Sequence, residues 1–161
     1  MSGEPPRSPE WPRVERVHLQ RQPRCMCCKP GTNTRAGLQV HHIFPFHYCI
    51  ALGRPDLELD DRNLITLCED EAGKPGQNHH LLVGHLDDFE SSNLAVVEDA
   101  GSTFHGMDAL AIKSDLTWLR KKVSRLRPLQ QMTAADKEAF REAMNRRLPR
   151  SSTPASRAIA T

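Results

Sequence analysis

The chain has 161 residues, of which 38% are hydrophobic and 5% aromatic, and its formal net charge is +2. A chain of this size and composition buries only a modest core, which a bound metal or another cross-link would help to stabilise. No run approaches the ~18 apolar residues of a membrane span, and the first residues lack the apolar core of a signal peptide. We therefore expect a cytoplasmic protein with no membrane segment.

In chain order, we expect residues 1–7 to be disordered and a helix to begin at Ser8-Pro9-Glu10, with Ser8 as its N-cap. This helix should end near Gln22-Pro23 and carry His18 on its surface. Alternating apolar and polar residues predict a strand at Leu38–Ile43, and apolar residues predict a second strand at Asn63–Leu67. The long connection between the two strands is expected to hold one helical turn, at His47–Leu52.

After the second strand the sequence predicts a polar loop at Glu69–Asn78 and a helix from His79 to about Glu90. A further strand is expected at Leu94–Val97. Apolar residues spaced by three and four predict an amphipathic helix over Ile112–Leu126. A last helix is predicted at Thr133–Leu148, followed by a disordered tail over 149–161.

The charges are unevenly distributed along the chain. Residues 51–100 carry three Lys/Arg and twelve Asp/Glu, whereas residues 113–150 carry eleven Lys/Arg and four Asp/Glu. Basic segments of this kind are compatible with a nucleic-acid backbone, although solvated helix faces explain them equally well.

Cysteine and histidine are concentrated in a way that indicates metal binding. The five cysteines are an odd number, and six of the eight histidines lie between positions 41 and 85. Cys25 and Cys28 form a C-x2-C pair, and Cys68 with His79 would complete a tetrahedral Cys3His site for a structural Zn²⁺. Cys27 could replace either member of the pair, whereas Cys49 is expected to be a packed apolar residue.

Three blocks of sequence resemble the HNH endonucleases that contain zinc. They are Leu38–Pro45 (LQVHHIFP), Asp60–Cys68 (DDRNLITLC) and Asn78–His85 (NHHLLVGH). The resemblance implies an α+β fold with a ββα-metal (HNH) core and a zinc knuckle, flanked by an N-terminal helix and C-terminal helices. The implied nuclease domain is 8–100, and 101–148 would be a basic helical C-terminal extension.

The resemblance also implies roles for individual residues in phosphodiester hydrolysis, usually of DNA. His41 and His80 stand at the positions that bind a catalytic divalent ion, which would be Mg²⁺, Mn²⁺ or another transition metal. His42 stands at the general base that activates water, and Asn63 at the residue that holds the long loop. His85 stands near a downstream histidine that contacts the phosphate or the metal, but it follows His80 by five residues rather than four.

Some alternatives stay open on the sequence alone. His79 and His80 could exchange roles between the two metals. His41 and His42 would point to opposite faces of a regular strand, so a bulge would have to turn both into one site, or each would act from its own side. A second functional hypothesis is a non-catalytic zinc module that binds nucleic acid or protein, and the C-terminal helices are a possible homodimer interface.

Overall fold

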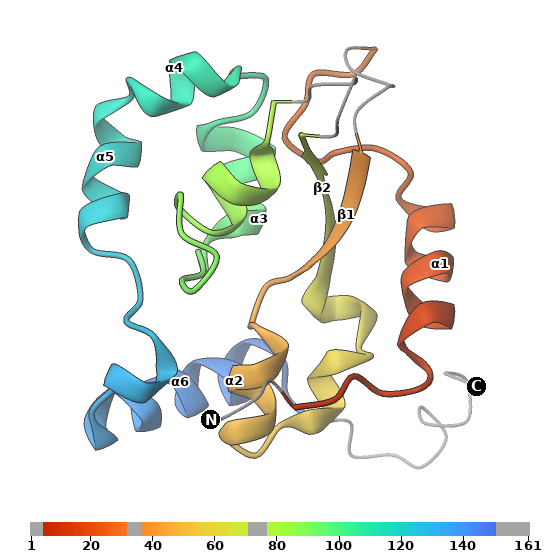
Figure 1. Cartoon of the computed structure of the whole chain (residues 1–161), viewed down its shortest axis with the longest axis vertical. Helices are drawn as coiled ribbons and strands as arrows, with labels where there is room; N and C mark the ends of the chain where they lie inside the picture. Colours follow the sequence, from red (N-terminus) through yellow and green to blue (C-terminus); the bar gives the residue numbers. More distant parts are fainter. Residues whose placement is uncertain (1–4, 32–36, 71–76, 151–161) are drawn as a thin grey trace. The chain divides into compact units, whose positions relative to one another are not determined.

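The computed structural model describes residues 5–31, 37–70 and 77–150. The chain divides into two compact units, Met1–Gln131 and Met132–Thr161. The first unit is a mixed α+β domain built around a two-stranded antiparallel hairpin (Figure 1). In the described parts of the chain no helix has the length and apolar character needed to cross a membrane.

The hairpin consists of β1 (Gly37–His42) and β2 (Leu64–Glu69), which confirms the two expected strands with shifts of one or two residues. The pairing runs without interruption from Gly37 opposite Glu69 to His42 opposite Leu64. Successive side chains of β1 therefore point to opposite faces of the hairpin. This alternation decides where the two adjacent histidines of β1 lie.

Helix α1 (Trp11–Arg21) covers one face of the hairpin (Figure 1). It begins later than expected because Ser8 does not cap it: the Ser8 carbonyl and hydroxyl oxygens instead accept hydrogen bonds from the Trp11 and Glu10 amides, at 3.0 and 3.2 Å. The expectation that His18 is a surface residue is wrong. His18 is fully buried, and its Nδ1 lies 2.9 Å from Oδ1 of Asp61.

The connection between the strands is built from short helical turns. They are α2 (Phe46–Ala51), which confirms the expected helical turn, and the 3-10 turns η1 (Pro55–Glu58) and η2 (Asp61–Asn63). The expected disordered segment 1–7 is described only from residue 5. There the Arg7 guanidinium lies 4.9 Å from the Trp11 ring centroid and 4.1 Å from that of Phe46.

The other face of the hairpin contacts η3 (His80–Gly84), a single π-helical turn. The expected helix to Glu90 is wrong, because the chain leaves helical geometry at Leu86 and Asp87, which have φ values of 51° and 69°. The loop expected before it, Glu69–Asn78, lies partly outside the described residues.

The strand expected at Leu94–Val97 is also wrong. The Asn93 side chain accepts a hydrogen bond from the Ala95 amide at 3.0 Å and its carbonyl accepts one from Val96 at 3.1 Å, which starts a helical turn. This turn is α3 (Val96–Glu98), and it continues into a second π-helical turn, η4 (Asp99–Thr103).

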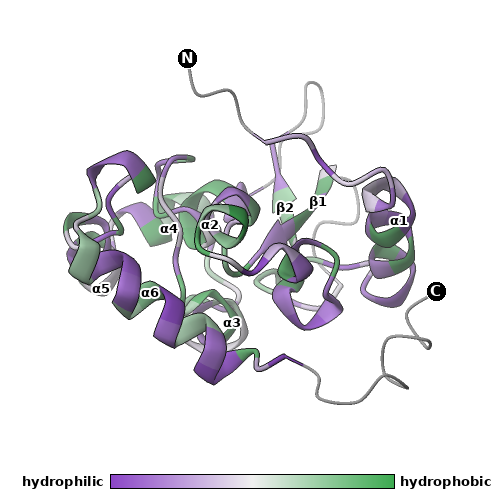
Figure 2. Ribbon diagram, turned by 90° about the horizontal axis from the view of Figure 1, so that it is seen from below, coloured by the Kyte–Doolittle hydropathy of each residue, from purple (hydrophilic) through white to green (hydrophobic). Residues whose placement is uncertain are grey.

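The helix expected at Ile112–Leu126 is two helices, α4 (Ala109–Lys113) and α5 (Leu116–Val123). Asp115 interrupts the expected helix, because its side chain caps α5 by accepting a hydrogen bond from the Trp118 amide at 3.0 Å. The predicted apolar stripe is divided by this break: Ile112 in α4 is buried, whereas Leu116 and Val123 in α5 are 68% and 88% exposed. Hydrophobic and hydrophilic residues accordingly share the visible surface of α5 in Figure 2.

After η5 (Leu129–Gln131), the second unit contributes α6 (Ala134–Arg147), which confirms the last expected helix. Thr133 and Asp136 form a capping box at its start. The expected disordered tail is described only to residue 150, and 151–161 lie outside the described residues.

Candidate metal centres

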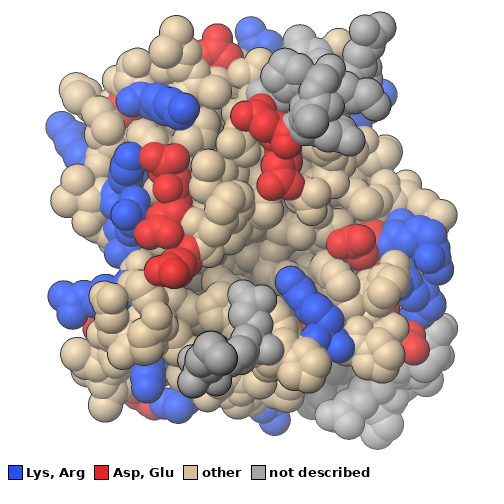
Figure 3. All heavy atoms as spheres, in the orientation of Figure 1, with Lys and Arg blue, Asp and Glu red and all other residues tan. Residues whose placement is uncertain are grey.

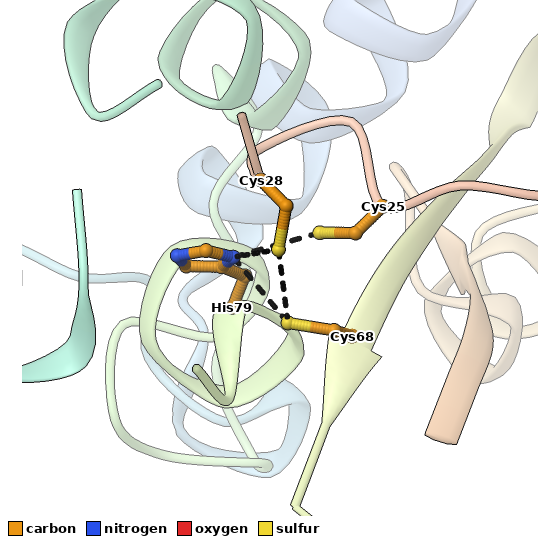
Figure 4. Close-up of side chains that lie close together, drawn as sticks. All are labelled: Cys25, Cys28, Cys68 and His79. Atoms are coloured by element: carbon orange, nitrogen blue, oxygen red, sulfur yellow. Dashed lines mark hydrogen bonds between the residues drawn. The ribbon is translucent and has the colours of Figure 1, made fainter. Parts of the chain in front are cut away.

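Four side chains from three segments of the chain converge to form a Cys3His cluster. The members are Cys25, Cys28, Cys68 and His79 (Figure 4). The His79 Nδ1 atom lies 3.5 Å from the Cys25 sulfur and 3.4 Å from each of the other two, and the Cys28 and Cys68 sulfurs are 3.8 Å apart. A tetrahedral zinc ion would set about 3.5 Å between nitrogen and sulfur and about 3.8 Å between sulfurs. The side chains thus have the ligand types and the spacing of a structural zinc site.

The protein also fixes the orientation of the histidine in this cluster. His79 Nε2 lies 2.7 Å from the Met107 carbonyl oxygen, to which it can only donate a proton. Its Nδ1 therefore carries the lone pair that faces the three sulfurs, as a zinc ligand requires. Sequence reasoning missed Met107, because a backbone carbonyl can be supplied by any residue type.

The thiols differ in their readiness to ionise. Hydrogen bonds from Cys28 and Cys68 lower the pKa of Cys25, and the same hydrogen bonds raise the pKa of Cys28, so the cluster favours one shared thiolate. Burial raises the pKa of Cys27, whose sulfur lies 3.3 Å from the Phe104 carbonyl oxygen. Burial likewise raises the pKa of Cys49 to about 12. These two cysteines lie outside the cluster, and Cys49 is a packed residue, as expected.

Three imidazoles form a second cluster on the face of the hairpin that contacts η3. We call His41, His80 and His85 the histidine triad; each offers one ring nitrogen, and these atoms all lie within 4.8 Å of one another. The Nε2 atoms of His80 and His85 are 3.2 Å apart. Two imidazoles that share a metal ion place their nitrogens at about 3–3.4 Å, which matches this distance.

Hydrogen bonding leaves lone pairs available within the triad. His85 Nδ1 donates to the Ser91 carbonyl oxygen at 2.7 Å, so its Nε2 is the unprotonated nitrogen. The buried His41 Nε2 has no hydrogen-bond partner among the residues that the structure describes. A buried polar atom without a partner is costly, and a metal ion would satisfy it.

Burial keeps the triad uncharged near neutral pH. It is the largest cause of the lowered pKa at all three residues, and it brings the pKa of His80 to about 4. Neutral imidazole is the form that binds metal. Behind His80, the Glu69 Oε1 atom lies 4.0 Å from Nδ1, on the opposite side of the ring from Nε2.

The π-helical turn explains how His80 and His85 meet. In an α-helix, side chains five residues apart point about 140° away from each other. A π-turn hydrogen-bonds residue i to residue i+5, so it brings such a pair together. Gly84 makes room for the third member, because a Cβ atom at this position would lie 3.0 Å from His41 Cε1.

His42 is not brought into the triad. It lies on the opposite face of β1, with its ring centroid 4.7 Å from that of Trp11, and its Nε2 donates to the Glu58 carbonyl oxygen at 2.8 Å. Burial lowers the pKa of His42 to about 4, with a smaller contribution from the positive charge of Arg7. Its Nδ1 is therefore unprotonated and can accept a proton.

Asn63 holds the connection between the strands. It is fully buried, and its Oδ1 accepts a hydrogen bond from the Phe44 amide at 2.8 Å. Its Nδ2 donates to the carbonyl oxygens of Phe44 and Leu57 at 3.1 and 3.0 Å. These bonds fix the two ends of the connection beside the end of β1.

No family model, curated protein or solved structure matches this chain. The geometry of the two clusters is therefore what indicates the function of this protein. Of the residues proposed from sequence, His79 lies with the three thiols, whereas His41, His80 and His85 lie together.

Two lysines of α5 and an arginine that follows it form ion pairs within the protein. Lys121 pairs with Asp99 and Lys122 with Asp87, both at 2.8 Å, and Arg125 pairs with Asp88 at 3.3 Å. On the face drawn in Figure 3, Lys and Arg side chains are interspersed with Asp and Glu rather than gathered into one basic patch. The basic segment seen in the sequence is thus partly neutralised by the acidic one.

Proposed function

We propose that the protein is a metal-dependent endonuclease of the HNH type, which hydrolyses phosphodiester bonds in DNA. The observation that carries this proposal is the histidine triad, in which three neutral imidazoles converge beside the end of a zinc-stabilised hairpin. The order of strand, long connection, strand and helical turn is the order that the HNH resemblance predicts.

The triad is the proposed site of a catalytic divalent ion. His41, His80 and His85 would hold it, and an all-imidazole set favours Mn²⁺ or another transition metal over Mg²⁺. Such an ion would stabilise negative charge on the phosphoryl group and on the leaving oxygen. The buried, unpartnered Nε2 of His41 supports this assignment.

His42 is the proposed general base. Its Nδ1 would take a proton from water as the water oxygen bonds to phosphorus and the bond to the 3′ oxygen breaks. An in-line displacement places the attacking and leaving oxygens on opposite sides of the phosphorus. His42 lies at the end of β1, and its Nε2 donates to the Glu58 carbonyl oxygen, so that the free Nδ1 supports its role as the group that takes the proton.

Plasmid cleavage across a series of Mg²⁺, Mn²⁺ and Ni²⁺ tests the proposal. We expect the wild type to cut, and His42→Ala to lose about 10²–10⁴-fold in rate while keeping its zinc. His80→Ala should lose activity together with metal binding at the triad. His105→Ala, outside the triad, is the matched control and should cut normally. A wild type that leaves the plasmid intact with every metal would overturn the proposal.

A zinc module without catalysis is the competing hypothesis. It predicts nucleic-acid binding without cleavage and no effect of His42→Ala. It gives no reason for one buried and two half-buried imidazoles to bring ring nitrogens within 4.8 Å of one another, so the nuclease is the better supported of the two.

A further inference from the structure

Phe89 is an unusual phenylalanine in this protein. The other four phenylalanines are 5% exposed or less, whereas Phe89 is 53% exposed. Its ring centroid lies 5.6 Å from that of His80 and 5.0 Å from that of His85. These distances are typical of aromatic contacts. A large apolar ring is thus held in solvent directly beside two members of the triad.

The loop that carries Phe89 is strained. Leu86 and Asp87 both adopt the left-handed backbone conformation, with φ values of 51° and 69°. Residues with a Cβ atom adopt this conformation only at a cost, and strain of this kind concentrates at functional sites. The two residues end η3 abruptly and turn the chain so that Phe89 comes back over His80 and His85.

Helix α5 and the residues after it hold this loop in place. Arg125 donates a hydrogen bond to the Leu86 carbonyl oxygen at 3.3 Å. The Ser91 hydroxyl donates a hydrogen bond to the Leu126 carbonyl oxygen at 3.1 Å. Lys122 and Arg125 form the ion pairs with Asp87 and Asp88 described above. These hydrogen bonds and ion pairs therefore hold the loop in one defined conformation.

The same ion pairs alter the electrostatics beside the triad. Asp87 and Asp88 directly precede Phe89 in the sequence and would repel a phosphate if they were unpaired. Pairing with Lys122 and Arg125 offsets their charge. This pairing reduces the repulsion between the loop and an anionic strand but does not remove it, because exposed Glu90 directly follows Phe89.

We propose that Phe89 stacks on a nucleobase of an unpaired DNA strand, next to the phosphate that a metal ion at the triad would bind. This inference rests on the proposed nuclease function. An exposed aromatic ring stacks on any base, because every base has a π-face, but the base must first be free of its own neighbours. The protein should therefore favour single-stranded DNA, or DNA with an unpaired nucleotide, over an intact duplex.

Binding of a short fluorescent single-stranded DNA oligonucleotide tests the contact without requiring cleavage. We expect Phe89→Ala to raise the Kd by about tenfold or more. Phe89→Tyr, which keeps the ring, should bind as the wild type does, and Phe89→Leu, which keeps only apolar bulk, should bind weakly. Zinc content and thermal unfolding of Phe89→Leu should match the wild type, which separates stacking from a structural role.

An oligonucleotide with abasic nucleotides provides the decisive comparison. If Phe89 contacts a base, wild type and Phe89→Ala should bind the abasic strand equally. Equal binding of the normal strand by both proteins, or no binding by the wild type, would overturn the inference. Failure of the nuclease proposal would appear separately, as strand binding that depends on Phe89 but is never followed by cleavage.

Discussion

Asn63 shows how one side chain can organise a long connection. Its amide makes three hydrogen bonds, two to Phe44 and one to Leu57, and it is fully buried. The residue type suits the task because an amide offers both a donor and an acceptor, so it can pair with a backbone amide and with carbonyls at once. It thereby ties the connection to the end of β1, next to His41 and His42.

Replacing Asn63 by alanine should destabilise the protein by about 2–4 kcal/mol, because three buried backbone groups lose their partner. Chemical denaturation of the zinc-loaded protein measures the loss. Asn145→Ala, at an exposed position on α6, is the control and should change the free energy of unfolding by less than about 0.5 kcal/mol. An unchanged free energy for Asn63→Ala would show that these hydrogen bonds contribute nothing net.

The sequence predicts side chains with distinctive chemistry better than it predicts their partners. The spacing of Cys25 and Cys28, and the alternation that separates His41 from His42, follow from local geometry. Met107 and Ser91 orient their histidines through backbone carbonyl oxygens. No residue type marks such an oxygen, so only the tertiary fold reveals it.

At the scale of elements, the π-turn η3 is the feature that local patterns cannot predict. Apolar residues after His79 fit an α-helical stripe, and the helix continued in that way would separate His80 from His85. The single local sign is Gly84, which is unfavourable inside a helix and is kept where another group must approach closely. Similarly, Asp115 is a helix-capping residue within the apolar stripe, and its capping tendency breaks that helix in two.

Gly84→Ala should weaken metal binding at the triad by about tenfold or more, because the new methyl group would press on the His41 ring and shift it. Titration of the zinc-loaded protein with Mn²⁺ or Co²⁺ measures the affinity, and the zinc content should stay the same. Gly101→Ala in η4 is the matched control, since a Cβ atom there meets nothing within 4 Å. Wild-type affinity in Gly84→Ala would refute the requirement for glycine.

At the scale of the whole molecule, the Cys3His cluster and a set of ion pairs join segments that the small hydrophobic core would hold together only weakly. The Cys3His cluster joins the cysteine turn, the end of β2 and the start of η3, and Met107 connects it to the segment before α4. Ion pairs between residues 121–125 and residues 87–99 join the basic and acidic parts of the sequence. Counting charges along the chain cannot reveal this pairing, because it depends on which segments fold against each other.

Purified protein should contain about one equivalent of tightly bound zinc, and its removal should unfold the first unit. The physical reason is that three segments far apart in the sequence would lose their shared cross-link, leaving thiols and an imidazole buried together without a partner. A strong chelator should therefore lower the melting temperature sharply, and Cys68→Ser should reproduce this effect without the chelator.

Cys49→Ser is the matched control for the loss of a thiol. Cys49 is buried, and its sulfur donates to the Phe44 carbonyl oxygen at 3.4 Å, away from the Cys3His cluster. This variant should keep its full zinc content, because a hydroxyl can take over the hydrogen bond and no ligand is removed. Full zinc content in Cys68→Ser, or a melting temperature that the chelator leaves unchanged, would contradict a structural role for the cluster.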